Sequence, residues 1–112
     1  MPTVTRAVAD WATTVTYDQL PEAVVREAKR YLMDSVGCAL GGAQQHDVEL
    51  ARRVLREIAG TGPCRVLVTG DRMDPVSSSL LNALMIRVMD YNDIYWKQDP
   101  SHPSDIIPAA IA

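Results

Sequence analysis

Apolar residues recur at helical spacing along most of the chain and predict a mainly α-helical fold. Val4, Val8, Trp11 and Val15 share one face of a first helix, and Trp11 on that face is expected in the core. The predicted helices cover residues 1–15, 21–42, 47–59 and 75–91, and a further helix begins within residues 102–112. Thr3 or Thr5 is a candidate cap for the first helix, and Asp47 is the expected cap of the third.

In one segment the apolar side chains alternate between two faces, as in a β-strand, instead of recurring at helical spacing. Cys64–Thr69 has Val66 and Val68 on one side and Leu67 on the other, which predicts the single β-element of the chain near residues 64–69. Residues 70–75 are expected to form a turn, and residues 92–101 a loop.

Composition and charge limit the classes of protein to which this chain can belong. The chain has 112 residues, of which 47% are hydrophobic and 22% charged, which is typical of a globular domain. The net charge of −3 without a basic block argues against nucleic-acid binding. The apolar runs are shorter than the roughly 18–20 residues of a membrane span, and the N-terminal segment has no signal-peptide pattern.

The two cysteines, Cys38 and Cys64, lack a CxxC arrangement and are too few to hold an iron–sulfur cluster alone. Without a secretory signal, we expect reduced thiols in a cytoplasmic protein.

Residues 89–105 concentrate the candidate chemistry. Asp90 and Asp93 are three residues apart and share a face if the preceding helix reaches them. Two close carboxylates can bind a metal or serve in acid–base catalysis, but they can also be solvated or capping residues at a helix end. A magnesium site is usually built around substrate phosphates, and the sequence has no glycine-rich phosphate loop, so no metal is assigned.

His102 is the stronger candidate, because it precedes Pro103 at an expected helix start. The helix dipole disfavours an imidazolium there, and a neutral ring can act as a general base. The free N–H groups at Ser104 and Asp105 can hold a substrate carboxylate. The alternative is a histidine that only caps or packs.

Four blocks of sequence together resemble the N-terminal part of the MmgE/PrpD family, which includes 2-methylcitrate dehydratase and cis-aconitate decarboxylase. The matching blocks are Leu20-Pro21, Asp34–Gly42, Asp90–Asp93 and His102–Asp105. Members of this family have a large helical domain and a smaller α/β lid domain, are several times longer than this chain, and are typically homodimers. The resemblance implies that residues 1–112 are the N-terminal fragment of the helical domain, without the lid. The apolar, uncapped end of the chain agrees with a longer natural protein.

The resemblance also implies roles for particular residues. Asp90, Asp93 and His102 take the positions of the family's catalytic residues. Ile94 stands where many members have a threonine, so this chain lacks the hydroxyl donor that those members have at this position. Family sites also use a lysine and a second histidine from later in the chain.

The function that the resemblance implies is a cofactor-independent lyase of small di- or tricarboxylic acids, similar to 2-methylcitrate dehydratase. The chemistry is removal of a proton next to a carboxylate, followed by loss of water. The fragment alone is expected to be inactive. The alternatives are a decarboxylase or epimerase of the same family, or a non-catalytic helical interaction module.

Overall fold

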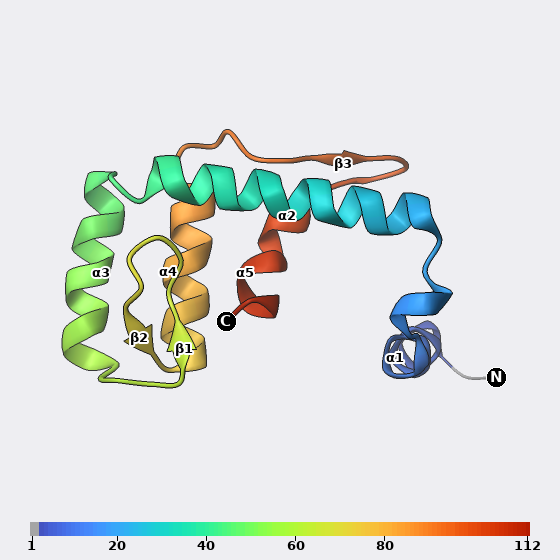
Figure 1. Cartoon of the computed structure of the whole chain (residues 1–112), viewed down its shortest axis with the longest axis horizontal. Coiled ribbons are helices and arrows are strands. Elements are labelled where there is room, and N and C mark those ends of the chain that lie inside the picture. The colour runs from blue at the N-terminus through green and yellow to red at the C-terminus, as the bar shows by residue number, and fades with distance from the viewer. Residues whose placement is uncertain (1–2) are drawn as a thin grey trace.

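The computed structural model describes residues 3–112, and it is mainly helical as predicted (Figure 1). The described residues form five α-helices, two short 3₁₀ helices and two small two-stranded sheets. The elements are α1 (Val4–Thr14), η1 (Tyr17–Gln19), α2 (Glu22–Gly42), α3 (His46–Ile58), β1 (Cys64–Arg65), β2 (Arg72–Met73), α4 (Pro75–Arg87), β3 (Tyr95–Trp96), β4 (Pro100–Ser101), η2 (Pro103–Asp105) and α5 (Ile107–Ala110).

Each predicted helix is present, with shifted ends. Thr3 caps α1 as predicted, because its Oγ1 accepts a hydrogen bond from the Arg6 N–H at 3.3 Å. Residues 1–2 of the predicted first helix lie outside the described residues. The third helix begins one residue before the predicted cap, so Gln45 and not Asp47 occupies the cap position. The fourth helix ends at Arg87, four residues before the predicted end.

The predicted strand over Cys64–Thr69 is wrong in its length. Only Cys64 and Arg65 are extended, and they pair antiparallel with β2. The backbone then reverses over the next residues, where Val68 adopts a left-handed conformation with φ 58°. Val66 is buried. Val68 is 50% exposed, so the two valines do not share one face of a strand as the alternation predicts.

A second sheet lies within the predicted loop over residues 92–101. Tyr95 pairs with Ser101, and Trp96 pairs with Pro100, to form the antiparallel β3–β4 hairpin. All four of these residues are exposed, so the hairpin contributes little to the core. Two-stranded hairpins of this size are marginally stable without such packing.

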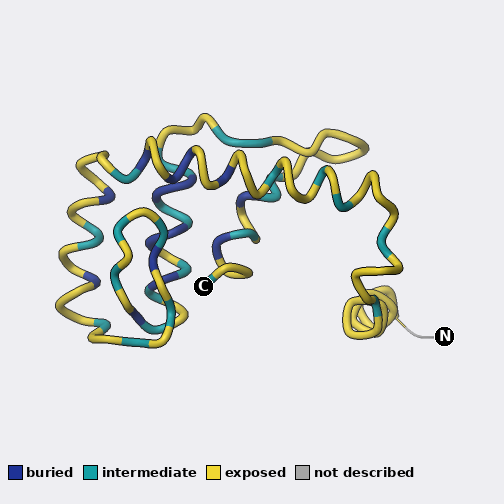
Figure 2. The backbone as a smooth tube through the Cα atoms, viewed as in Figure 1, coloured by how far each residue is buried: buried dark blue, intermediate teal, exposed yellow. Residues whose placement is uncertain are grey.

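The core lies where α2, α3 and α4 meet the β1–β2 hairpin, at one end of the molecule (Figure 2). A β-carbon on Gly42 would collide with the backbone carbonyl of Met85, so this glycine allows α2 and α4 to pack closely. The Leu67 N–H donates to the Asn82 Oδ1 at 2.8 Å, which ties the hairpin to α4. The buried hydrophobic residues are Cys38, Ala39, Val48, Leu55, Val66, Met73, Leu81, Met85 and Ile86.

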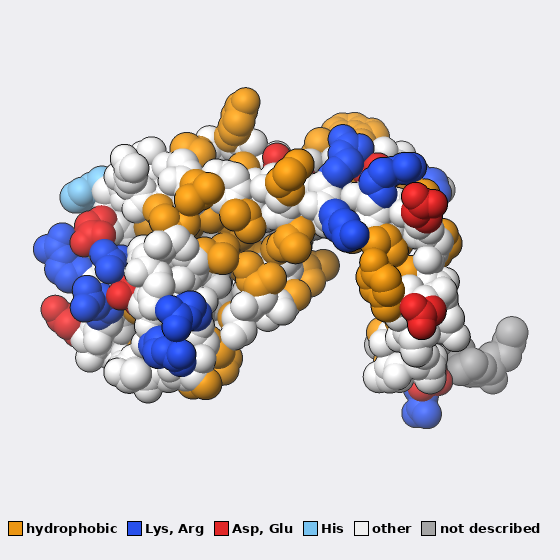
Figure 3. All heavy atoms as spheres, viewed as in Figure 1, with side chains coloured by type: hydrophobic (Ala, Val, Ile, Leu, Met, Phe, Trp, Pro, Cys, Tyr) orange, Lys and Arg blue, Asp and Glu red, His pale blue; other side chains and the backbone are white. Residues whose placement is uncertain are grey.

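Helix α1 lies at the other end of α2, away from this core (Figure 1). None of its residues is buried, and Trp11 is 60% exposed, so the prediction of a core position for Trp11 is wrong. Figure 3 shows further hydrophobic side chains at the surface beneath α2, while Lys and Arg side chains lie both at the end that carries α3 and on the part of α2 towards α1, with Asp and Glu among them. Within residues 3–112, no helix combines the length and the apolar character that a membrane crossing requires.

Candidate functional site

The site window begins where α4 ends, and its first residue redirects the chain. Asp90 has a left-handed backbone with φ 49°, and its N–H donates to the Arg87 carbonyl at 2.9 Å. Aspartate is among the few non-glycine residues that adopt this conformation readily. The helix therefore stops before Asp90 and Asp93, so the condition under which they would share a helical face is not met. Asp90 is exposed, whereas Asp93 is half-buried.

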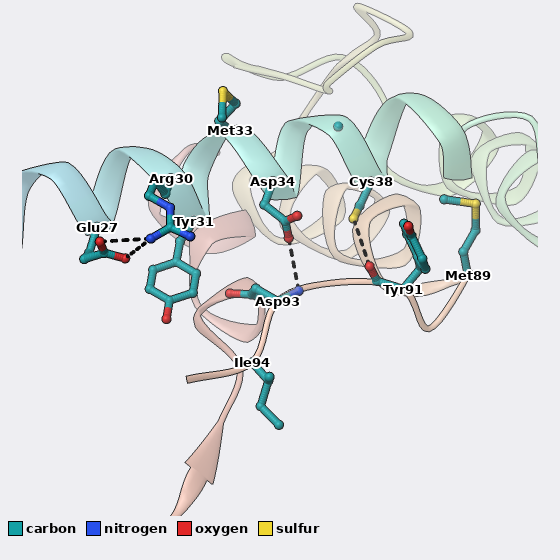
Figure 4. A pocket seen from close by; sticks show the side chains of 11 residues that line it. Glu27, Arg30, Tyr31, Met33, Asp34, Cys38, Met89, Tyr91, Asp93 and Ile94 are labelled. Atoms are coloured by element: carbon teal, nitrogen blue, oxygen red, sulfur yellow. Dashed lines mark hydrogen bonds and ion pairs between the residues drawn. The ribbon is translucent and has the colours of Figure 1, made fainter. Parts of the chain in front are cut away.

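Asp93 connects three parts of the molecule. Its N–H donates to the Asp34 Oδ2 on α2 at 3.0 Å (Figure 4). Its carboxylate accepts the Ser104 N–H at 3.2 and 3.3 Å, at the start of η2. Its carbonyl oxygen lies 2.5 Å from the Nδ1 of His102. The structure thus brings Asp93, His102 and Ser104 together, whereas the recorded hydrogen bond of Asp90 is to the Arg87 carbonyl.

The contact with Asp93 defines the tautomer of His102. A carbonyl oxygen can only accept a hydrogen bond, so Nδ1 must carry the hydrogen and donate it. In the neutral ring Nε2 then has a free lone pair and is the proton acceptor. His102 is half-buried and occupies the N-cap position of η2, so the predicted helix start is present as a short 3₁₀ turn.

Ser104 and Asp105 hold η2 in place. The Asp105 N–H donates to the His102 carbonyl at 2.9 Å, and the Ser104 N–H is already bonded to Asp93. The Ser104 hydroxyl is fully buried and accepts hydrogen bonds from Asn92 and Arg87, at 2.9 and 3.2 Å. Arg87 also pairs with the Asp105 carboxylate at 3.5 Å. Both predicted N–H donors therefore have partners in this structure, and a role in substrate binding stays a prediction.

A hollow of about 710 Å³ lies between α2 and the segment over residues 89–94 (Figure 4). Neither Asp90 nor His102 lines it. Its charged lining residues are three carboxylates and one guanidinium, namely Glu27, Asp34, Asp93 and Arg30. Arg30 pairs with Glu27 at 3.0 Å. The hollow therefore has an excess of negative charge.

Cys38 also lines this hollow, as a buried thiol. Burial raises the pKa of the Cys38 thiol, and the nearby carboxylates of Asp34 and Asp93 raise it further. The thiol donates weakly to the Tyr91 carbonyl, with a separation of 3.8 Å between Sγ and the oxygen. A thiol held in its protonated form is a poor nucleophile, so the structure gives Cys38 a packing role. Both cysteines are free.

Asp34 is the residue that sequence reasoning missed. Aspartate in the middle of a helix is unusual, because its side chain favours caps over interiors. An ion pair with Arg30, one turn earlier in the helix, would be the local explanation, but Arg30 pairs with Glu27, and Asp34 binds the backbone of Asp93. The unusual mid-helix aspartate can be recognised in the sequence, but its hydrogen-bond partner Asp93 lies 59 residues away along the chain. Among the described residues, no three His, Cys, Asp or Glu side chains are placed to hold a metal ion.

Comparison with known proteins identifies related sequences. The family model described as the MmgE/PrpD N-terminal domain matches residues 6–112. Cis-aconitate decarboxylase from Aspergillus terreus is 28% identical over 108 residues, and the match covers 96% of this chain. The cis-aconitate decarboxylase-like protein oryM from Aspergillus oryzae is 26% identical over 108 residues, with the same coverage. The matched region is 22% of the length of each relative. No solved structure matches the chain significantly.

Proposed function

The chain belongs to the MmgE/PrpD family, whose N-terminal domain it matches, and from this premise we propose that it forms part of a cofactor-independent lyase. The proposed substrates are small di- or tricarboxylic acids. The proposed reaction removes a proton from the carbon next to a carboxylate and then expels water. The family match and the similarity to cis-aconitate decarboxylase of Aspergillus terreus support this proposal.

The tautomer of His102 is the observation that carries this proposal. With Nδ1 donating to the Asp93 carbonyl, Nε2 of the neutral ring is free to accept a proton. In a dehydration, Nε2 takes the proton from carbon, the carbon–oxygen bond breaks, and the hydroxide leaves as water once it is protonated. A histidine contributes typically 10²- to 10⁴-fold to such a proton transfer.

The charge of the hollow beside Asp93 supports a site that further protein completes. His102 does not line this hollow, but Asp93, which contacts the His102 ring, does. Three carboxylates against one paired guanidinium there repel an anionic di- or tricarboxylate. The carbanion-like transition state also needs nearby positive charge or hydrogen-bond donors. We therefore propose that cationic groups from outside these 112 residues complete the site, and that this chain alone is inactive.

Two reactions remain candidates within this chemistry. The length of the segment from Asp93 to His102 resembles that of methylcitrate dehydratases, and we propose dehydration of 2-methylcitrate on that ground. The similarity to cis-aconitate decarboxylase of Aspergillus terreus favours loss of carbon dioxide as the second candidate. Decarboxylation needs a proton delivered to carbon, so His102 would then act as the acid.

The exposed side chains and the free cysteines also bear on the assembly and the cellular location of the protein. The exposed apolar side chains, such as Leu40 and Leu80 at 57% and 56% exposure, support burial against further protein, and we propose a homodimer. We propose that the protein is cytoplasmic, on the ground of its two free cysteines. A non-catalytic assembly module is the alternative that the activity test excludes or supports.

The test uses the protein at its natural length, with His102→Ala and the exposed His46→Ala as a matched control. Formation of the carbon–carbon double bond from 2-methylcitrate, followed by ultraviolet absorbance, and release of carbon dioxide from cis-aconitate are measured in parallel. We expect His102→Ala to lower kcat about 100-fold or more without a matching loss of stability, and His46→Ala to change neither. Equal losses of activity and stability in His102→Ala would contradict the proposal, as would turnover by the 112-residue chain alone.

A further inference from the structure

We propose that Asp34 is a positioning residue for His102, and that it acts through the backbone of Asp93. The inference rests on the proposed function for the role of His102 as the proton-transfer group. The geometry that carries it does not depend on which acid is the substrate.

Asp34 makes the stronger of two polar contacts that join α2 to the segment over residues 88–94. Its Oδ2 accepts the Asp93 N–H at 3.0 Å, a charge-assisted hydrogen bond of ordinary length. The other contact, from the Cys38 thiol to the Tyr91 carbonyl, is weak and 3.8 Å long. Loss of the Asp34 carboxylate therefore leaves this segment with a single weak polar tether to α2.

The same residue that Asp34 holds also holds the imidazole. The N–H of Asp93 is bonded to Asp34, and the carbonyl of the same residue accepts the Nδ1–H of His102. A shift of the Asp93 backbone would move this carbonyl away from the ring. Without the carbonyl, nothing in the described contacts of His102 selects the Nδ1–H tautomer, and Nε2 loses its defined role as the acceptor.

Local helix stability does not account for the carboxylate at position 34. Asp34 is exposed and is not among the buried residues of α2. Alanine is a better helix former than aspartate in a helix interior. Asp34→Ala should therefore leave α2 folded and at least as stable, while it removes the contact with Asp93. This separation of effects distinguishes positioning from a general structural role.

The test compares three variants of the protein at its natural length, labelled with ¹⁵N in histidine. Asp34→Ala removes the acceptor, and Asp34→Asn removes the charge but keeps a side-chain carbonyl that can accept the N–H. Glu27→Ala is the matched control, because Glu27 is a carboxylate of the same helix and the same hollow and its recorded bond is to Arg30. The ring-nitrogen chemical shifts of His102 report its tautomer, and exposed His46 serves as an internal reference.

We expect Asp34→Ala to convert His102 from the Nδ1–H tautomer to a mixture, while Asp34→Asn and Glu27→Ala keep the wild-type tautomer. Hydrogen exchange of the segment over residues 88–94 should be faster in Asp34→Ala alone. If Asp34→Ala does not fold, Asp34→Ser replaces it, because the shorter hydroxyl does not reach the Asp93 N–H. An unchanged tautomer in folded Asp34→Ala or Asp34→Ser would overturn the inference, and so would an equal change in Glu27→Ala or Asp34→Asn.

Kinetics then separate this inference from the proposed function. If the wild-type protein turns over a carboxylic acid, Asp34→Ala should lower kcat about tenfold or more with KM within about twofold, and Asp34→Asn should restore most of kcat, since misplacement of a proton-transfer group affects the chemical step. A fall in kcat/KM that comes from KM alone would contradict positioning. If the wild type turns over none of the acids tested, the proposed function fails, and the tautomer experiment still decides whether Asp34 positions His102.

Discussion

Helices α1 and α4 both have clear sequence signals, but only α4 is part of the core. α1 has an apolar stripe on one face and a capping threonine, yet none of its residues is buried. α4 is capped by Asp74, whose carboxylate accepts the N–H groups of Val76 and Ser77, and five of its residues are buried. The buried residues of α4 are Ser78, Leu81, Asn82, Met85 and Ile86.

The difference follows from what surrounds each helix. α4 is apolar around most of its circumference and has α2, α3 and the β1–β2 hairpin packed around it, which is the pattern of a central helix. α1 has a narrow apolar stripe, and nothing in the described part of the chain covers it. A periodic pattern therefore predicts that a helix forms, but burial depends on partners that the local sequence does not name.

The largest expected effect tests the packing of α4. Leu81 is fully buried, so Leu81→Ala should lower the free energy of unfolding by about 2–5 kcal/mol, from lost burial and the cavity left behind. Leu80, its neighbour on the same helix, is 56% exposed, and in the 112-residue chain without a partner Leu80→Ala should change stability by less than about 0.5 kcal/mol. Chemical denaturation measures both values. Similar losses in the two variants would mean that α4 is not the central helix of this core.

The next effect compares two glycines of α2. Gly42→Ala places a β-carbon against the Met85 carbonyl, so α2 and α4 must separate, and we expect a loss of about 1–3 kcal/mol. Gly37→Ala meets no neighbouring atom and should stabilise the helix by up to about 1 kcal/mol. Opposite shifts of the midpoint in thermal denaturation check this prediction. A tolerated Gly42→Ala would rule out the close approach of the two helices.

A smaller effect compares ion pairs in the two regions. The hydrogen bond from Arg52 lowers the pKa of Asp71, and the charges of Arg52 and Arg56 lower it further. Asp71 has only 15% of its side chain exposed, whereas Asp10 of the Arg6–Asp10 pair on α1 has 59% exposed. A lowered folded-state pKa means that the stabilisation by Asp71 is present above its unfolded-state pKa and is lost as the pH falls through the folded-state value.

Asp71→Asn should therefore lower the free energy of unfolding at pH 7 by about 1–2 kcal/mol, between the values for exposed ion pairs and for buried charged hydrogen bonds. Its difference from the wild type should shrink below about pH 4, where the unfolded aspartate is protonated. Asp10→Asn, which removes an exposed ion pair, should lower the free energy of unfolding at pH 7 by less than about 1 kcal/mol. Urea denaturation from pH 2 to 7 gives both curves, and a constant difference for Asp71→Asn would show that the ion pair is not the cause.

The smallest effect concerns α1. Trp11→Gln removes the largest side chain of the exposed stripe and should change the unfolding free energy of the chain by less than about 0.5 kcal/mol, because 60% of Trp11 is exposed. Chemical denaturation followed by far-ultraviolet circular dichroism measures this change in free energy, because the signal does not rely on tryptophan fluorescence. A loss of 2 kcal/mol or more would mean that α1 docks on the core, and would remove the contrast between the two helices.

The helices could be predicted from the sequence because their period, caps and glycine stops are local. Two other features could not be predicted, because in each the structure departs from the local pattern of the sequence. The Val66–Thr69 segment alternates like a strand, but it turns back to pack Val66 on the helices. The apolar residues Val88 and Met89 continue the pattern of α4, but the helix ends at Arg87, and Asp90 has a left-handed backbone.

The candidate site was predictable only in its residue types. Asp93 and His102 lie in one short window of sequence, and the structure brings them together. The contact with Asp34 joins residues 59 positions apart, and no periodicity reports on such a pairing. The occupied N–H groups of Ser104 and Asp105 depend on the position of Asp93 and on a turn too short for a helix with free N-terminal donors.

The long span between Asp34 and Asp93 also affects the order in which the chain assembles. Bringing two residues together across 59 positions has an entropic cost that local helix formation does not, so this contact should form late in folding, after α2 and α4 have packed. The hydrogen bond from Asp93 to His102 spans only 9 positions, but its geometry depends on that late contact. A partly folded chain can therefore contain every helix and still lack an ordered imidazole, so the state of His102 reports on completion of the fold.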